Sequence, residues 1–205
     1  MPSRRLLPKA ITAALLLLGS GGLLQAWNHS PSAAANLVQA PSPGAYAITP
    51  QRRALLNTIR YAEGTWKQGS GEGYHSLYGG GRFASLARHP EIVVVKRYRS
   101  AAAGAYQFLP GTWREASAKL QLASFQPANQ DQAALYLVDR RGVLNEIDRE
   151  GLTRRAMAVL AKEWASFPSQ AGRSFYGQPV KQAEDLERFY QASLEASREH
   201  ERQPA

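Results

Sequence analysis

The chain has 205 residues, 44% of them hydrophobic, and its 25 basic and 16 acidic residues give a formal net charge of +9 at pH 7. It contains no cysteine, which excludes disulfide bonds and a cysteine nucleophile, and its four histidines are not spaced like metal ligands. No glycine-rich phosphate loop follows an apolar strand, and the basic residues are not interleaved with aromatic ones in one patch, so we expect no metal ion, no cofactor and no nucleic-acid partner.

The first 48 residues precede the predicted folded domain. Arg4, Arg5 and Lys9 are followed by an apolar run over residues 10–24, which is typical of a secretory signal peptide and short for a membrane span. We interpret residues 1–26 as a signal peptide or an uncleaved signal anchor, with a twin-arginine or an ordinary basic start. Residues 27–48 are rich in alanine, serine and proline and are predicted to form a flexible linker. We therefore expect export to the periplasm or the extracellular space, with transient membrane contact through residues 1–26.

A first helix is predicted from Pro50, which Thr49 precedes as a capping residue, to Gly64. Leu55 and Ile59 are one helical turn apart and share a face of this helix. We expect that face to be the buried one, because the polar residues at 53, 57 and 60 fall elsewhere on the helix.

Glu63 extends the apolar face of the first helix by one more turn, at its C-terminal end. The helix dipole there costs an anion about 0.3–1 kcal/mol, which is less than the several pKa units that desolvation can contribute. Burial should therefore raise the pKa of Glu63 and keep it protonated near neutral pH, as a general acid requires. The alternative from these residues alone is an exposed or ion-paired glutamate at a frayed helix end.

A glycine-rich segment over residues 69–81 comes next. Because glycine disfavours helix, we predict short strands with tight turns there. The β-branched run Ile92–Val95 is predicted to be a further short strand or a buried extended segment. Together these segments would form a small β-hairpin wing beside the first helix.

The rest of the chain is predicted to be helical. Pro110 opens one helix, a second runs over residues 129–141 and stops at Gly142, and apolar stripes at 156–164 and 186–194 indicate two more. The fold class predicted is α+β and predominantly helical, with the domain at residues 49–192 and a polar C-terminal tail at residues 193–205.

Eight short motifs lie in order along residues 49–190: Ala62-Glu63-Gly64-Thr65; Gly73-Tyr74 with Gly79-Gly80; Gly104-Ala105-Tyr106-Gln107-Phe108; Phe125-Gln126-Pro127 before Gln130-Asp131; Arg141-Gly142; Ile147-Asp148-Arg149; Trp164-Ala165-Ser166-Phe167-Pro168; and Tyr176-Gly177-Gln178. Together they resemble the phage lambda endolysin family, lytic transglycosylases of the lysozyme superfamily. Each motif alone is weak, but eight in order are a specific signal. The family in its usual form lacks an export segment, and it has acids in the wing where this chain has His75, Gly81 and Arg88.

The resemblance implies a lysozyme-like fold in which residues 49–192 are the catalytic domain and Glu63 is the catalytic carboxylate. It implies that Glu63 protonates the glycosidic oxygen between N-acetylmuramic acid and N-acetylglucosamine in peptidoglycan glycan strands. The carboxylate then accepts the proton of the muramic acid 6-hydroxyl as that oxygen attacks C1. The product is a 1,6-anhydromuramic end, and we expect the protein to act as a monomer.

Two alternatives of other classes stay open. One is a hydrolytic muramidase acting on the same bond, which needs a second carboxylate or a bound water. Glu72 is the candidate for the second carboxylate, and Gln107 is the candidate for holding the water. Glu72 is the only acid between Gly64 and Pro90, although its glycine-rich surroundings favour a solvated loop position. The other alternative is a non-catalytic module that binds the cell wall, against which the retained Glu63 argues.

Substrate contacts are implied by the resemblance at the Gly104-Ala105-Tyr106-Gln107 motif. A glutamine that closes a Gly-x-x-Gln pattern faces the cleft opposite the catalytic acid in this superfamily, and its amide offers both a donor and an acceptor to a sugar. Tyrosines of the wing and of the late loop are candidates for sugar stacking or for packing. The candidate substrate contacts are Gln107, Tyr106, Tyr78, Tyr176 and Ser100.

Overall fold

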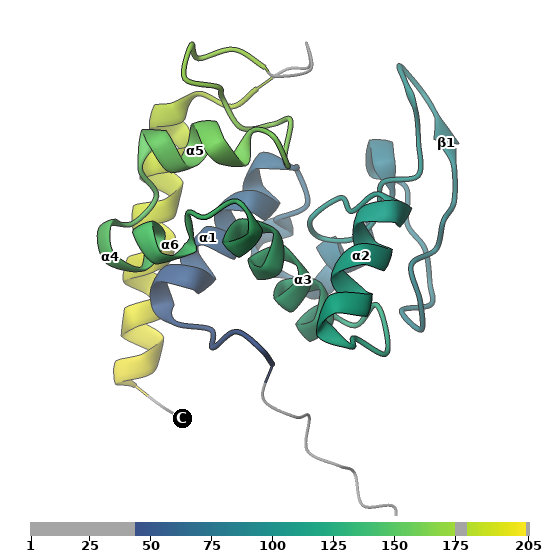
Figure 1. Cartoon of the computed structure of the whole chain (residues 1–205), viewed down its shortest axis with the longest axis horizontal. Coiled ribbons are helices and arrows are strands. Elements are labelled where there is room, and N and C mark those ends of the chain that lie inside the picture. Colours follow the sequence, from purple (N-terminus) through teal and green to yellow (C-terminus); the bar gives the residue numbers. More distant parts are fainter. Residues whose placement is uncertain (1–43, 175–179, 204–205) are drawn as a thin grey trace, which may run out of the picture. The chain divides into compact units, whose positions relative to one another are not determined.

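The computed structural model describes residues 44–174 and 180–203, which belong to one compact unit (Figure 1). The predicted signal segment and residues 27–43 of the predicted linker lie outside the described residues. The described elements, in chain order, are α1 (Pro50–Ala62), the 3₁₀ turns η1 (Lys67–Gly69), η2 (Gly71–His75) and η3 (Tyr78–Gly80), β1 (Val94–Val95), β2 (Arg99–Ser100), α2 (Pro110–Leu120), α3 (Pro127–Arg140), α4 (Leu144–Glu150), α5 (Arg154–Leu160) and α6 (Ala183–Arg202). The predicted α+β, predominantly helical class is confirmed.

Helix α1 is the central element and packs against α6, α3 and α4 (Figure 1). As predicted, Thr49 is its N-cap: the Thr49 hydroxyl accepts a hydrogen bond from the Arg52 N–H at 3.3 Å. The helix ends at Ala62 and Glu63 is its C-cap. The chain therefore leaves the helix at Glu63, the predicted acid.

The expectation that α1 buries only one face is wrong, because every residue from Ala54 to Arg60 is buried. One of its buried polar residues, Asn57, donates to the hydroxyl of Ser193 on α6 at 2.9 Å. The Arg60 guanidinium lies over the ring of Trp66 at 5.0 Å and over that of Tyr74 at 4.8 Å. A helix enclosed on all sides holds its C-terminal residue in a defined position.

The wing differs in detail from the predicted hairpin. Its glycine-rich part forms the three 3₁₀ turns η1–η3 instead of strands, because Gly69, Gly79 and Gly80 adopt positive φ angles of 85°, 73° and 91°, which close tight turns. The antiparallel pair is made by β1 and β2, in the register Val94 opposite Ser100.

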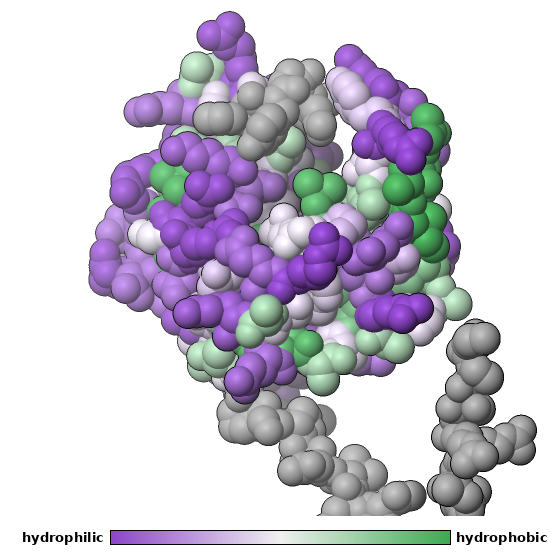
Figure 2. Space-filling view, turned by 45° about the vertical axis from the view of Figure 1, so that its right-hand side comes forward, coloured by the Kyte–Doolittle hydropathy of each residue, from purple (hydrophilic) through white to green (hydrophobic). Residues whose placement is uncertain are grey.

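Most of the large apolar side chains that are exposed in the described chain lie in or directly before the β1–β2 hairpin. The large apolar side chains that are exposed are Ile92, Val93, Val95, Tyr98 and Leu109. Figure 2 shows apolar residues along one edge of the molecule, next to strongly hydrophilic ones.

The helical lobe follows the prediction with shifted boundaries. Helix α3 begins at Pro127 rather than at residue 129, and Gly142, with a φ of 72°, follows its end as expected. Helix α4 was not predicted. Helix α5 ends at Leu160, before Trp164, and α6 continues as one helix to Arg202 through the expected start of the tail, with Leu194 buried.

Candidate active site

Glu63 lies where α1 ends and the wing begins. Its backbone N–H still bonds to the Ile59 carbonyl at 2.9 Å, and Gly64 then turns the chain with a φ of 72°. The side chain is half-buried, so it is shielded on the protein side and still accessible. The predicted position of this carboxyl group, at the end of a buried helix face, is therefore correct.

The surroundings of Glu63 favour its protonated form. Burial raises its pKa to about 7, and the hydroxyl of Ser166, which donates to Oε1 at 2.6 Å, opposes this shift. Within residues 44–174 and 180–203, no ion pair involves Glu63, so no cation stabilises the carboxylate there. At neutral pH the group is therefore close to half-protonated, which suits a residue that gives and then accepts a proton.

Hydrogen bonds bring three of the sequence motifs together around Glu63. The buried hydroxyl of Thr65 donates to the carbonyl of Ala105. The indole of Trp164 donates to the carbonyl of Tyr106 at 3.1 Å. The segments 62–65, 104–108 and 164–168 thus form one site, although they are far apart in the sequence.

Gln107 closes the tight turn of the 104–108 segment and is half-buried. It adopts a positive φ of 48°, and its Nε2 donates to the carbonyl of Gly104 at 3.0 Å. No described residue donates a hydrogen bond to its Oε1, which leaves an acceptor for a ligand. The turn depends on Gly104, where a Cβ atom would lie 2.3 Å from Oε1 of Gln130.

Tyr106 does not have the position that a substrate contact requires. Its side chain is 1% exposed, and its hydroxyl donates to Oδ1 of Asp131 at 2.6 Å. Tyr74 donates to the same oxygen at 2.7 Å, and Arg53 donates to Oδ2 at 2.8 Å. Burial and the Asp131 carboxylate raise the pKa of Tyr106 well above its usual value. The side chain anchors the turn that carries Gln107, whereas sequence reasoning placed it in the cleft.

The other predicted site residues lie in the wing or outside the described chain. Tyr78 is half-buried at the start of η3, and the Ser100 hydroxyl in β2 accepts the Ala102 N–H at 3.1 Å. The Glu72 side chain is 60% exposed and pairs with Arg82 at 3.0 Å. Tyr176 lies outside the described residues.

Ser166 is a site residue that sequence reasoning missed. It belongs to the Trp164–Pro168 motif, which was recognised, but nothing local distinguishes this serine from any other. Its importance follows from a contact with a residue 103 positions earlier in the chain.

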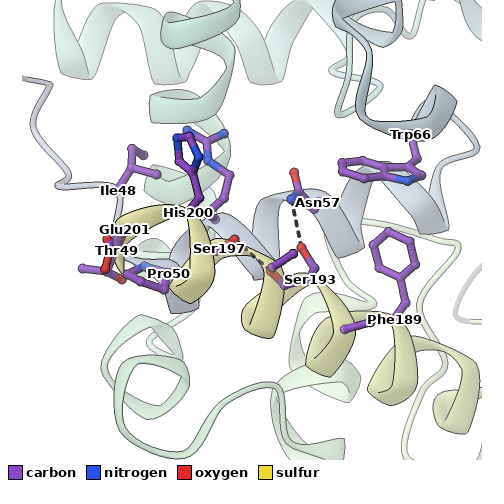
Figure 3. A pocket seen from close by; sticks show the side chains of 13 residues that line it. Ile48, Thr49, Pro50, Asn57, Trp66, Phe189, Ser193, Ser197, His200 and Glu201 are labelled. Carbon is purple, nitrogen blue, oxygen red and sulfur yellow. Dashed lines mark hydrogen bonds between the residues drawn. The ribbon is translucent and has the colours of Figure 1, made fainter. Parts of the chain in front are cut away.

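Two cavities of the described chain are lined by other residues than the two principal site residues, Glu63 and Gln107. One of about 610 Å³ lies between the N-terminal part of α1 and α6, and in Figure 3 Asn57 and Ser193 meet at its wall. Another of about 900 Å³ is lined by α5 and residues 168–172. Neither is lined by Glu63 or Gln107.

In the described part of the chain no helix is long and apolar enough to cross a bilayer, and no cluster of three or more potential metal-binding side chains occurs.

Comparison with known proteins gives a consistent result. The model of the family described as Endolysin matches residues 53–196. The endolysin of Escherichia phage lambda is 35% identical over 144 residues, which are 68% of this chain and 88% of that protein. The endolysin of Escherichia phage P2 is 39% identical over 88 residues, 43% of this chain and 50% of that protein. A solved structure of bacteriophage lambda lysozyme in complex with a chitohexasaccharide is similar with a TM-score of 0.65 and 33% identity, over 72% of this chain and 96% of the lambda chain.

Proposed function

This chain belongs to the Endolysin family and is a lysozyme-like enzyme that degrades peptidoglycan; on that premise we propose that it is a lytic transglycosylase with Glu63 as its single catalytic carboxylate. The observation that carries the proposal is a half-buried carboxyl group with a pKa of about 7 and no ion pair among the described residues. Such a group is present in both protonation states near neutral pH, and one residue can therefore act first as acid and then as base.

The reaction is balanced without water. Protonated Glu63 donates its proton to the glycosidic oxygen as the bond from that oxygen to C1 of N-acetylmuramic acid breaks. The 6-hydroxyl oxygen of the same sugar bonds to C1, and its proton passes to the Glu63 carboxylate, which restores the acid. The nucleophile belongs to the sugar itself, so proximity replaces a second catalytic group.

The structure of the wing favours this route over hydrolysis. Glycosidases that use two carboxyl groups hold them about 5–9.5 Å apart across the bond. The Glu72 side chain is mostly exposed and is engaged by Arg82, so nothing confines it beside the Glu63 carboxyl group.

We further propose that the surface around Glu63 and Gln107 binds a glycan strand of peptidoglycan. A solved structure of the lambda relative is a complex with a chitohexasaccharide. Gln107 is our principal candidate contact, since its Oε1, to which no described residue donates, can accept a hydrogen bond from a sugar hydroxyl or an acetamido N–H. Export directed by residues 1–26 would place the enzyme at its substrate.

The test is product analysis. Purified cell walls are digested with the full chain, and the released muropeptides are analysed by mass spectrometry. Anhydro ends, one water lighter than reducing ends, are expected from the wild type and from Glu72→Gln, and no product from Glu63→Gln. Reducing ends from the wild type, or loss of activity in Glu72→Gln, would establish the hydrolytic alternative. A wall-binding Glu63→Gln protein with full activity would refute the role of Glu63.

A further inference from the structure

Ser166 is the only described residue that donates a side-chain hydrogen bond to Glu63, and the bond is short at 2.6 Å. A short O–H···O bond of this kind is typical of an ionised or strongly polarised acceptor. The hydroxyl reaches Oε1, and among the described residues no donor reaches Oε2. The two oxygens of the catalytic carboxyl group are therefore not equivalent.

The backbone around Ser166 holds this hydroxyl in place. The Ser166 carbonyl accepts the N–H of Lys181 at 3.0 Å, and the flanking side chains Trp164 and Phe167 are buried. The Trp164 indole is tied to the carbonyl of Tyr106. Because Trp164 and Phe167 are packed in the core, the backbone that carries the Ser166 hydroxyl is held in place beside Glu63.

We propose that Ser166 is a positioning residue that fixes the Glu63 carboxyl group and assigns its acidic proton to Oε2. An oxygen that accepts a hydrogen bond is favoured as the carbonyl oxygen of a carboxylic acid, since the hydroxyl oxygen is the poorer acceptor. With Oε1 held by Ser166 in both protonation states, Oε2 is the oxygen that delivers the proton to the glycosidic oxygen and later accepts it from the 6-hydroxyl. This inference rests on the proposed function of Glu63.

The same contact also sets the pH range of the enzyme. A donor to a carboxylate favours the ionised form, so it lowers the pKa of Glu63 that burial raises. Without the hydroxyl, burial acts alone and the pKa of Glu63 rises. Because the free enzyme must carry the acid in its protonated form, activity would then persist to higher pH while the rate at the optimum falls.

The test compares Ser166→Ala and Ser166→Thr with Ser117→Ala as the matched control. Among the described residues, the Ser117 hydroxyl bonds only to a carbonyl of its own helix. In the full chain labelled with ¹³C at glutamate side-chain carboxyl groups, the Glu63 resonance is assigned by its loss in Glu63→Gln and titrated. We expect a higher pKa and a descending limb of kcat/KM shifted to higher pH for Ser166→Ala. Its kcat should fall roughly 10-fold or more with little change in KM. Ser166→Thr and Ser117→Ala should match the wild type in both titrations.

An unchanged Glu63 titration in Ser166→Ala overturns the inference, as does a Ser166→Thr protein that behaves like Ser166→Ala. If Ser166→Ala does not fold, Ser166→Cys replaces it, because a thiol is a weaker donor of similar size, and a smaller upward shift is then expected. The titration does not depend on which product is formed. A hydrolytic product or an active Glu63→Gln protein therefore refutes the proposed function, whereas a normal titration in Ser166→Ala refutes only the role of this serine.

Discussion

Asp131 holds together the polar network beneath the 104–108 turn, and replacing it should destabilise the protein strongly. Its side chain is 8% exposed, and the carboxylate accepts from Tyr74, Tyr106 and Arg53. In Asp131→Ala the two phenols lose their partner in the core, at about 1–3 kcal/mol each. The Arg53 side chain is 37% exposed and can be hydrated again, so it should contribute at most about 1 kcal/mol. A total of about 4 kcal/mol corresponds to a fall in Tm of roughly 8–16 °C for a domain of this size.

The assay is thermal and urea unfolding followed by circular dichroism, with Asp139→Ala as the control. Asp139 is on the same helix but exposed, and it accepts only from Tyr46, so its loss should cost less than about 1 kcal/mol. Replacing Tyr74 and Tyr106 by phenylalanine in the Asp131→Ala background removes the orphaned hydroxyls and should restore part of the stability. The predicted cost of burying unpaired phenols is contradicted if Asp131→Ala is as stable as Asp139→Ala. It is also contradicted if the two phenylalanine replacements lower the stability of Asp131→Ala further.

The pKa of Glu63, about 7, predicts that kcat/KM falls about 10-fold per pH unit well above pH 7; a rate that stays constant to pH 9 contradicts its role as acid. His89 is buried, donates one ring N–H to a main-chain carbonyl and accepts a main-chain N–H, and burial lowers its pKa. The contribution of neutral His89 to folding stability is complete above the pKa of an unfolded histidine, about 6.5, and is lost as the pH falls below it. Between pH 7.5 and 5, the Tm of His89→Gln should therefore fall less than the Tm of the wild type. Gly104→Ala places a Cβ atom against Gln130 at a φ of 80°, which should cost more than about 2 kcal/mol. Gly111→Ala, whose Cβ meets no atom within 4 Å, should be near neutral in the same unfolding experiment.

The first helix and its acid could be predicted because their determinants are local. Thr49 and Pro50 define the start of α1, and the spacing of Leu55, Ile59 and Glu63 places the carboxyl group on a buried face. That α1 is enclosed on all sides could not be read from its own residues, since the elements that cover it lie elsewhere in the chain.

The residues that contact Glu63 and Tyr106 could not be predicted, for the same reason. Ser166 and Asp131 act through contacts between distant segments, and no short-range pattern marks a serine or an aspartate as the one that makes them. Tyr106 was placed in the cleft because its neighbour Gln107 fits a motif, but adjacent residues in a tight turn point in different directions, and the tyrosine is buried.

The glycine-rich part of the wing shows another limit of sequence reasoning. Glycine excludes a regular helix but permits both hairpin turns and 3₁₀ turns, and the choice depends on contacts such as that of Gly73. A Cβ atom there would lie 2.0 Å from the carbonyl of Thr65. Helix α4 was missed because it is only seven residues long, too short for an apolar stripe to be recognised.

The order in which the site's residues are synthesised has a consequence for shortened chains. A ribosome completes the acid at position 63 long before the serine at position 166 and the backbone amide of Lys181 that supports it. A chain terminated between these positions contains Glu63 but lacks the hydroxyl that donates a hydrogen bond to it. If Glu63 and Ser166 act as proposed, a chain that ends before position 166 should therefore not cleave peptidoglycan.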